Sequence, residues 1–180
     1  MKKLVLIPLA VLALVAIASA QMAGGKKPAS PPASAQCSFS DGKSVKIDYS
    51  SPRAKGRKIF GTGDALVPYG EVWRTGANDA TTFVTTANLN VGGKDVPAGN
   101  YTIFTVPNAN QWMLIINKKT GEWGIPYKYE SDELGRISMA VSKTAGPVEN
   151  FTIAFDQMGG KCTLRMEWEN TRATVDFSEK

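Results

Sequence analysis

Apolar and polar residues alternate with a period of two along much of the chain. Val45, Ile47 and Tyr49 alternate with Lys46 and Asp48, which is typical of a strand with one buried face. The same alternation recurs at residues 136–142, 151–156, 161–169 and 173–177. We therefore expect strands in these segments, each directing one row of apolar side chains towards a core.

Other segments also favour strands. Residues 81–86 are rich in Thr, Phe and Val, and residues 101–106 follow a Pro-Ala-Gly-Asn turn. The Gly92-Gly93 pair between residues 89–91 and 94–96 predicts a two-residue hairpin. Residues 112–116 are apolar without alternation, which predicts a strand covered on both faces.

About ten short strands with turns between them, and no long helical period, favour an all-β fold. We expect an antiparallel β-sandwich, jelly-roll-like in arrangement, rather than an α/β enzyme fold. This single domain is expected to span residues 37–180.

The N-terminal segment differs from this pattern. Two lysines precede an apolar run at residues 4–17 and the small residues Ala18-Ser19-Ala20, which predicts a secretory signal peptide at residues 1–20, cleaved after Ala20. The run is too short to span a bilayer comfortably. We therefore expect a periplasmic or extracellular protein with no integral membrane segment after cleavage.

Residues 21–36 are rich in Pro, Ala, Ser, Gly and Lys. Because they offer little apolar surface to offset the entropy of ordering them, they are expected to form a flexible tether.

The charge balance argues against a nucleic-acid partner. The chain has 21 basic and 16 acidic residues; without Lys2 and Lys3 the difference is 19 − 16, or +3. This excess is small and is dispersed among acidic residues, unlike the basic patches that bind nucleic acids.

The two cysteines and the absence of histidine limit the catalytic and metal sites that the chain could form. In an exported protein, Cys37 and Cys162 are expected to form one disulfide, the alternative being two free buried thiols. The chain has no histidine, which excludes Ser-His-Asp and Cys-His nucleophiles and disfavours zinc, copper and iron sites. No cofactor and no metal are expected.

Two polar loops are the candidate ligand-binding segments. In residues 51–58, Lys55 and Arg57 lie beside Gly56 with two further cations, and guanidinium groups there suit a carboxylate, phosphate or sulfate. The alternative is a solvated turn whose charges block strand pairing.

The second loop, residues 66–79, offers Tyr69, Trp73, Arg74 and Asn78. An aromatic face beside fixed polar groups suits a sugar or another amphipathic ring. The alternative is that Trp73 plugs the core while Arg74 pairs with a nearby carboxylate, Glu71 or Asp79, to order the loop.

Carboxylates are the one acid–base device left to a histidine-free enzyme. The candidates are Glu71, Asp79, Asp64 and Glu122, but no spacing marks any two of them as a pair.

The ordered motifs of the chain resemble a known family. They are Tyr-Ser-Ser-Pro at 49–52, Lys-Gly-Arg at 55–57, Ile-Phe-Gly at 59–61, Val-Pro-Tyr-Gly at 67–70, Val-Trp-Arg-Thr-Gly-Ala-Asn at 72–78, Pro-Ala-Gly at 97–99 before Tyr101, and the segment from Trp112 to Lys118. This series resembles domain of unknown function 2911, a group of exported, β-rich bacterial domains. The resemblance implies one coherent domain outside the cytoplasm and supplies no activity.

The leading hypothesis is a non-catalytic module that binds a polar, anionic or sugar-like ligand through the two loops. A second hypothesis is a carboxylate-dependent hydrolase or lyase acting on envelope saccharides, and a third is a structural envelope module. The sequence carries no indication of oligomeric state.

Overall fold

The protein is all-β. The structure, a computed structural model, describes residues 29–180, so the expected signal peptide lies outside the described residues. The strands are β1 (Pro32–Ser38), β2 (Ser44–Ser50), β3 (Phe60–Gly61), β4 (Val67–Pro68), β5 (Thr81–Thr85), β6 (Leu89–Val91), β7 (Lys94–Val96), β8 (Gly99–Val106), β9 (Gln111–Asn117), β10 (Glu133–Met158) and β11 (Lys161–Glu179). A single 3-10 turn, η1 (Glu130–Asp132), precedes β10.

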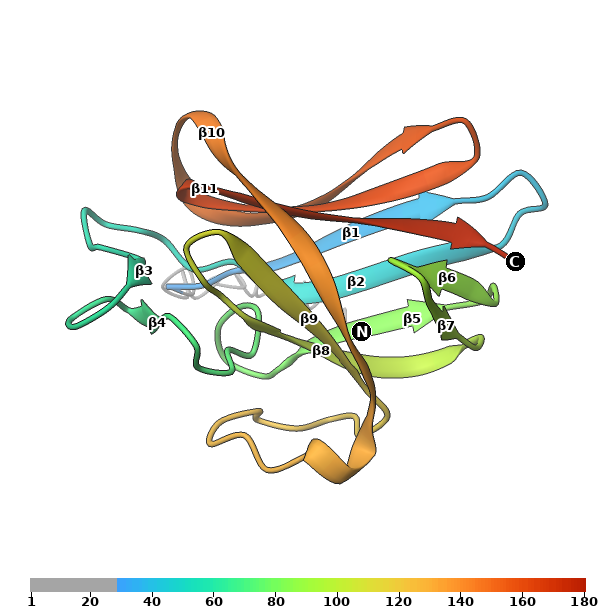
Figure 1. Ribbon diagram of the computed structural model, residues 1–180, viewed down its shortest axis with the longest axis horizontal. Coiled ribbons are helices and arrows are strands. Elements are labelled where there is room, and N and C mark those ends of the chain that lie inside the picture. The colour runs from blue at the N-terminus through green and yellow to red at the C-terminus, as the bar shows by residue number, and fades with distance from the viewer. Residues whose placement is uncertain (1–28) are drawn as a thin grey trace, which may run out of the picture.

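Nine of these strands form one sheet in the order β1-β2-β5-β8-β9-β10-β11-β6-β7, and neighbouring strands are antiparallel throughout. The short strands β3 and β4 pair in parallel beside it (Figure 1). The all-β, antiparallel prediction is therefore confirmed. No helix in the part of the chain that the structure describes is long and apolar enough to cross a membrane.

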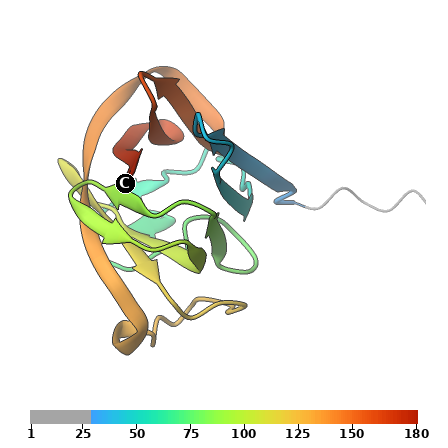
Figure 2. The same ribbon diagram turned by 90° about the vertical axis from the view of Figure 1, so that its right-hand side faces the viewer.

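The second layer arises because β10 and β11 are long and bent. The first part of β10, from Glu133 to Ala140, pairs with β9, whereas its distal half pairs with β11 alone. Figures 1 and 2 show this distal half turning back over β1 and β2. The four short strands predicted at residues 136–177 are thus two long strands, because the backbone stays extended through the interruptions in the alternation.

The run at residues 112–116 is covered on both faces, as predicted. Trp112, Leu114 and Ile116 belong to the main core. Ile115 faces the opposite way and packs with Phe104 in a smaller cluster, under the segment that connects β9 to β10. The hairpin predicted at Gly92-Gly93 is also present, joining β6 to β7.

The boundary expected between tether and domain is wrong by five residues. Residues 32–36, assigned to the tether by composition, form the start of β1 and pair with β2 from Pro32 onwards. Ala35 and Cys37 point inward and are buried. Small residues were sufficient here because the hydrogen bonds to β2, rather than side-chain volume, order the strand.

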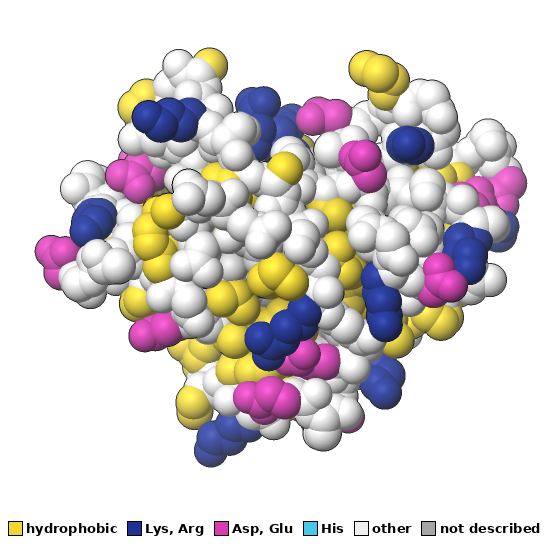
Figure 3. Space-filling view, in the orientation of Figure 1, with side chains coloured by type: hydrophobic (Ala, Val, Ile, Leu, Met, Phe, Trp, Pro, Cys, Tyr) yellow, Lys and Arg dark blue, Asp and Glu magenta, His cyan; other side chains and the backbone are white. Residues whose placement is uncertain are grey.

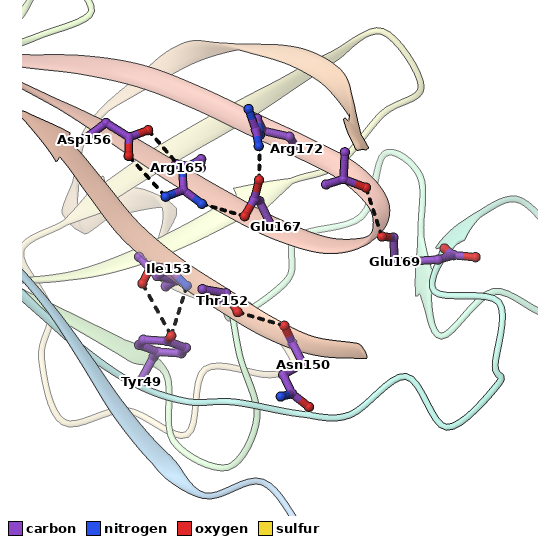
Figure 4. Close-up of polar contacts among 10 residues, drawn as sticks. Tyr49, Asn150, Thr152, Ile153, Asp156, Arg165, Glu167, Glu169 and Arg172 are labelled. Carbon is purple, nitrogen blue, oxygen red and sulfur yellow. Dashed lines mark hydrogen bonds and ion pairs between the residues drawn. The ribbon is translucent and has the colours of Figure 1, made fainter. Parts of the chain in front are cut away.

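A disulfide and a tyrosine hydroxyl are among the contacts that join the distal part of β10 and β11 to the first strands. Cys37 in β1 and Cys162 in β11 form a disulfide, with Cα atoms 6.2 Å apart, as predicted. The hydroxyl of Tyr49 in β2 accepts a hydrogen bond from the Ile153 N–H at 3.0 Å and lies 3.5 Å from the Ile153 carbonyl oxygen (Figure 4). The phenol therefore bridges two strands that do not pair directly.

The outer side of the β10–β11 hairpin carries a chain of ion pairs (Figure 4). Arg165 donates to Asp156 at 3.0 Å and to Glu167 at 2.5 Å, and Arg172 donates to Glu167 at 2.6 Å. Hydrogen bonds from Arg165 hold the pKa of the Asp156 carboxyl below its usual value. Elsewhere, on the face shown in Figure 3, Lys and Arg are interspersed with Asp and Glu.

Removing the disulfide should destabilise the protein without changing its fold. Cys37 and Cys162 are 125 residues apart in the sequence, and releasing a loop of this length costs about 4 to 5 kcal/mol in the chain-entropy model. We expect the Cys37→Ser/Cys162→Ser variant to unfold at correspondingly lower urea concentration, measured by tryptophan fluorescence. An unchanged midpoint would contradict this account.

Candidate functional site

The structure brings three of the six predicted ligand-binding residues to one cleft. Arg57, Trp73 and Arg74 line a cleft of about 340 Å³ at the end of the sandwich where β3 and β4 lie. Its other lining residues are Ser30, Pro52, Leu66, Val67, Gly76, Ala77, Ile125 and Trp168. Residues from the two polar loops therefore do share a cleft.

Trp73 is both a core residue and a wall of this cleft. Its ring stacks on Trp168 with centroids 5.8 Å apart and meets Phe151 edge-on at 4.8 Å. Its indole N–H donates to the Gly76 carbonyl at 3.0 Å. The plug interpretation of Trp73 is therefore correct, but one side of the ring still faces the cleft.

Arg74 does not pair with a carboxylate. Within residues 29–180 it makes no ion pair with Glu71, Asp79 or any other acid, and its Nη1 donates to the carbonyls of Asn78 and, at 3.3 Å, Trp123. The guanidinium also lies over the Trp123 ring, 4.5 Å from the centroid. Burial lowers the pKa of Arg74, and the charge of Asp79 opposes this only in part.

The loop that carries Arg74 is held in an unusual conformation. Thr75 and Asn78 both have positive φ, at 57° and 60°, a region that non-glycine residues seldom adopt. A Cβ on Gly76 would lie 3.0 Å from the Ser50 carbonyl oxygen, so a side chain there would have to displace this backbone by a few tenths of an ångström. The Thr81 hydroxyl donates to the Thr75 carbonyl at 2.7 Å and fixes the turn.

Asn78 acts as a clamp for this loop rather than as a cleft residue. Its Nδ2 donates to the Ser50 hydroxyl at 3.1 Å and to the Ser30 carbonyl at 3.4 Å. The Asn78 carbonyl oxygen accepts a hydrogen bond from the Arg74 side chain. The side chain therefore ties the loop to the end of β2 and to the start of the described chain.

Among the four basic side chains of residues 51–58, that of Arg57 alone lines the cleft. Its Nε donates to the Ala54 carbonyl at 3.0 Å and its Nη2 to the Arg53 carbonyl at 2.6 Å. Lys55 has a positive φ of 51°, and its backbone N–H bonds Glu149 at 3.0 Å, but it does not line the cleft. One guanidinium of the loop, rather than its whole charge, faces the candidate site.

A second cleft continues the first. It has a volume of about 440 Å³ and shares four lining residues with it, namely Leu66, Val67, Trp73 and Ile125. It then extends along Pro68, Glu71, Val72, Pro126 and Tyr127. We call the two together the cleft pair.

Exposed apolar side chains gather at the cleft pair. Among the described residues, the large apolar side chains with high exposure are Leu66 at 44%, Trp123 at 55%, Ile125 at 41% and Met158. Leu66 and Ile125 line both clefts, and Trp123 stacks with Arg74 at the rim. Sequence reasoning missed Trp123 and Ile125, because only the fold brings their segment to the two polar loops.

The candidate catalytic acids are not gathered. Glu71 is the single carboxylate that lines the cleft pair. Asp64 and Asp79 are exposed, and Glu122 lies 3.8 Å from Lys119. No three His, Cys, Asp or Glu side chains come together as a possible metal site in residues 29–180.

The segment that supplies Trp123 and Ile125 is braced by a polar network at its far end. Asn117 donates to the Tyr129 carbonyl at 2.8 Å and to the Tyr127 hydroxyl at 3.1 Å. Tyr127 donates in turn to Glu133 at 2.7 Å, and Arg136 donates to Glu133 at 2.9 and 2.8 Å. The bonds from Arg136, then Tyr127, hold the Glu133 pKa below its usual value against burial.

Tyr69, the remaining candidate, is separate from the cleft pair. It lines a different cleft, formed with the β8–β9 turn and the middle of β10 and β11.

A family model described as "Protein of unknown function (DUF2911)" matches residues 30–177, and so covers nearly all the described chain. No curated protein and no solved structure matches the chain.

Replacing Trp73 should cost far more stability than replacing Trp123. Trp73→Ala removes a ring from the aromatic cluster, and such core truncations cost about 3 to 5 kcal/mol. Trp123→Ala removes an exposed ring and a cation–π contact worth about 0.5 to 1 kcal/mol. Urea unfolding of the two variants checks this, and equal losses would contradict the core role of Trp73.

The brace at Glu133 should make stability depend on pH. Because its pKa is lowered in the folded state, Glu133 stabilises the protein above its unfolded pKa, and this contribution is lost as the pH falls through the folded value. We expect Glu133→Gln to lower the free energy of unfolding by about 1 to 2 kcal/mol at pH 7, and the difference from wild type to shrink as the pH falls through the lowered pKa of Glu133. A difference that is independent of pH would contradict this role.

Proposed function

This chain belongs to the DUF2911 family, a family of proteins of unknown function, and we propose that it is an extracytoplasmic binding protein. Its ligand is a small amphipathic anion, with a carboxylate or phosphate at one end and an apolar body.

The observation that carries this proposal is the way Arg57 and Arg74 are held at the first cleft. Each guanidinium has five N–H donors, and each donates two hydrogen bonds to main-chain carbonyl oxygens. Carbonyls orient the group without neutralising its charge, and no carboxylate lines this cleft. The remaining donors suit the planar, bidentate recognition of an anion.

The apolar body is supported by the walls of the cleft pair. Leu66, Trp73 and Ile125 line both halves, so an apolar chain or ring that begins beside the guanidiniums continues into the second cleft. Exposed apolar side chains gathered in one place are typical of a binding groove.

The extracytoplasmic location rests on two features. Residues 1–20 have the composition of a secretory signal peptide, and disulfides persist mainly in oxidising compartments. The disulfide between Cys37 and Cys162 fits such a compartment.

A structural role is the second candidate. It is favoured by the side chains of Arg74 and Asn78, which brace their own loop. The hydrolase hypothesis lacks comparable support, because the cleft pair holds one carboxylate where two facing acids are needed.

The test is isothermal titration calorimetry of the protein with decanoate and, separately, with decanol. We expect decanoate to bind to the wild-type protein. Arg57→Gln should lower the affinity for decanoate at least about tenfold, because it removes one charged hydrogen-bonding group. Lys55→Gln, which removes the same charge from the same loop outside the cleft, is the matched control and should bind as wild type does.

Two outcomes would overturn the proposal. Decanol binding as tightly as decanoate would show that the guanidiniums recognise nothing. Absence of decanoate binding, together with a loss of stability in Arg74→Ala of several kcal/mol, would favour the structural role instead.

A further inference from the structure

A third cleft lies where the pairing of β10 with β11 is interrupted. The register passes from Lys143 opposite Thr171 to Val148 opposite Glu169, so residues 144–147 of β10 face only Asn170 of β11. Glu169 has a positive φ of 53° at this point. Such bulges bend a strand and redirect its side chains, and they are frequent beside functional sites.

The cleft at this bulge has a volume of about 350 Å³. Three parts of the fold meet there, and Figure 1 shows the β8–β9 turn beside the bend of β10 and β11. The polar side chains that line it are Tyr69, Asn110, Ser142, Lys143, Asn170 and Thr171. None of these residues lines the cleft pair.

These six side chains keep their hydrogen-bonding capacity. Within residues 29–180 none of them makes a side-chain hydrogen bond or an ion pair, whereas the neighbouring Thr144 donates to the Glu169 carbonyl at 3.2 Å. Hydroxyls and amides both donate and accept. The cleft therefore presents both hydrogen-bond donors and acceptors, whose partners are water or a ligand.

Tyr69 is a fixed part of this cleft. Its backbone N–H donates to the Gly61 carbonyl at 2.8 Å, and the next N–H, of Gly70, donates to Pro107 at 2.9 Å. The ring packs partly against the main core, so little side-chain freedom remains to be lost on binding. A rigid aromatic beside hydroxyls and amides suits a sugar ring.

Lys143 sets the expected charge of the ligand. It is the single charged side chain among the lining residues, and no carboxylate lines the cleft. An acid group on the ligand would meet one ammonium and no repulsion.

We propose that this cleft is a second binding site, for a saccharide that bears one carboxylate, as a uronic acid does. The amides and hydroxyls bind the sugar hydroxyls, Tyr69 contacts the ring, and Lys143 pairs with the carboxylate. The site is independent of the cleft pair and of the anion proposed for it.

The test is nuclear magnetic resonance of the isotopically labelled full domain, titrated with galacturonate, with galactose and with acetate. We expect galacturonate to shift the amide signals of Asn110, Lys143 and Asn170 and to bind more tightly than either comparator. Lys143→Gln should weaken galacturonate binding by up to about fivefold, since an exposed ion pair contributes up to about 1 kcal/mol, and should leave galactose binding unchanged. Lys161→Gln, an exposed lysine elsewhere on β11, should change neither.

The alternative results each overturn the proposal. If acetate bound as tightly as galacturonate, the site would be no more than a lysine that attracts any anion. Shifts confined to Trp73 and Arg74 would place the sugar in the cleft pair. Absence of shifts at millimolar galacturonate, with a folded protein, would show that the cleft binds no such ligand, and would leave the decanoate titration unaffected.

Discussion

The packing of Trp73 against Trp168 connects the two layers of the sandwich to the loops that carry the candidate site. Trp168 comes from the bent strand β11, and Trp73 from the irregular segment after β4. Their rings stack at 5.8 Å, and Phe60 and Trp112 meet Trp73 at 5.9 and 6.4 Å. Aromatic residues bury large areas and constrain one another's orientation. The position of the loop, and so of Arg74 next to Trp73, depends on this cluster.

The cluster explains why a long polar loop can have a defined shape. Loops of this composition lose substantial conformational entropy when they are ordered. Here the entropy loss is offset at one end by the packing of the partly buried Trp73 indole and at the other by the hydrogen bonds of Asn78 to Ser50 and Ser30. Thr75 and Asn78 can then be held at positive φ, a conformation that persists only where the surroundings enforce it. The guanidinium of Arg74 is placed by this frame rather than by its own flexible stem.

The sequence was sufficient to predict those features that depend on local pattern. The period of two predicted the strands, the continuous run around Trp112 predicted coverage on both faces, and the two cysteines predicted the disulfide. It was insufficient where a long-range contact decides the outcome. The local sequence does not distinguish the bend of β10 from an ordinary turn. Gly146 and Pro147 are compatible with a bulge in one continuous strand and equally with a turn between two strands.

The same distinction applies to the candidate site. Arg57, Trp73 and Arg74 were identified because an arginine or a tryptophan in a glycine-punctuated loop is unusual by itself. Ile125 and Trp123 look ordinary in the sequence, and only the packing of their segment against the Arg74 loop makes them part of the site. Tyr69 was predicted as a ligand-binding residue of the same loop, yet it lines a different cleft.

The arginines on the outer face of β11 and those at the first cleft have different kinds of hydrogen-bond partner. On the outer face of β11, Arg165 and Arg172 meet carboxylates, and Glu167 between them has both as partners. At the first cleft, the side chains of Arg57 and Arg74 donate hydrogen bonds only to carbonyl oxygens, although Asp79 is close enough to affect the pKa of Arg74. Ion pairing satisfies a guanidinium within the protein, whereas carbonyl contacts hold it in place and leave its charge unbalanced. A guanidinium that is held in place but not paired with a carboxylate, beside exposed apolar side chains, is the feature on which the proposed anion site depends.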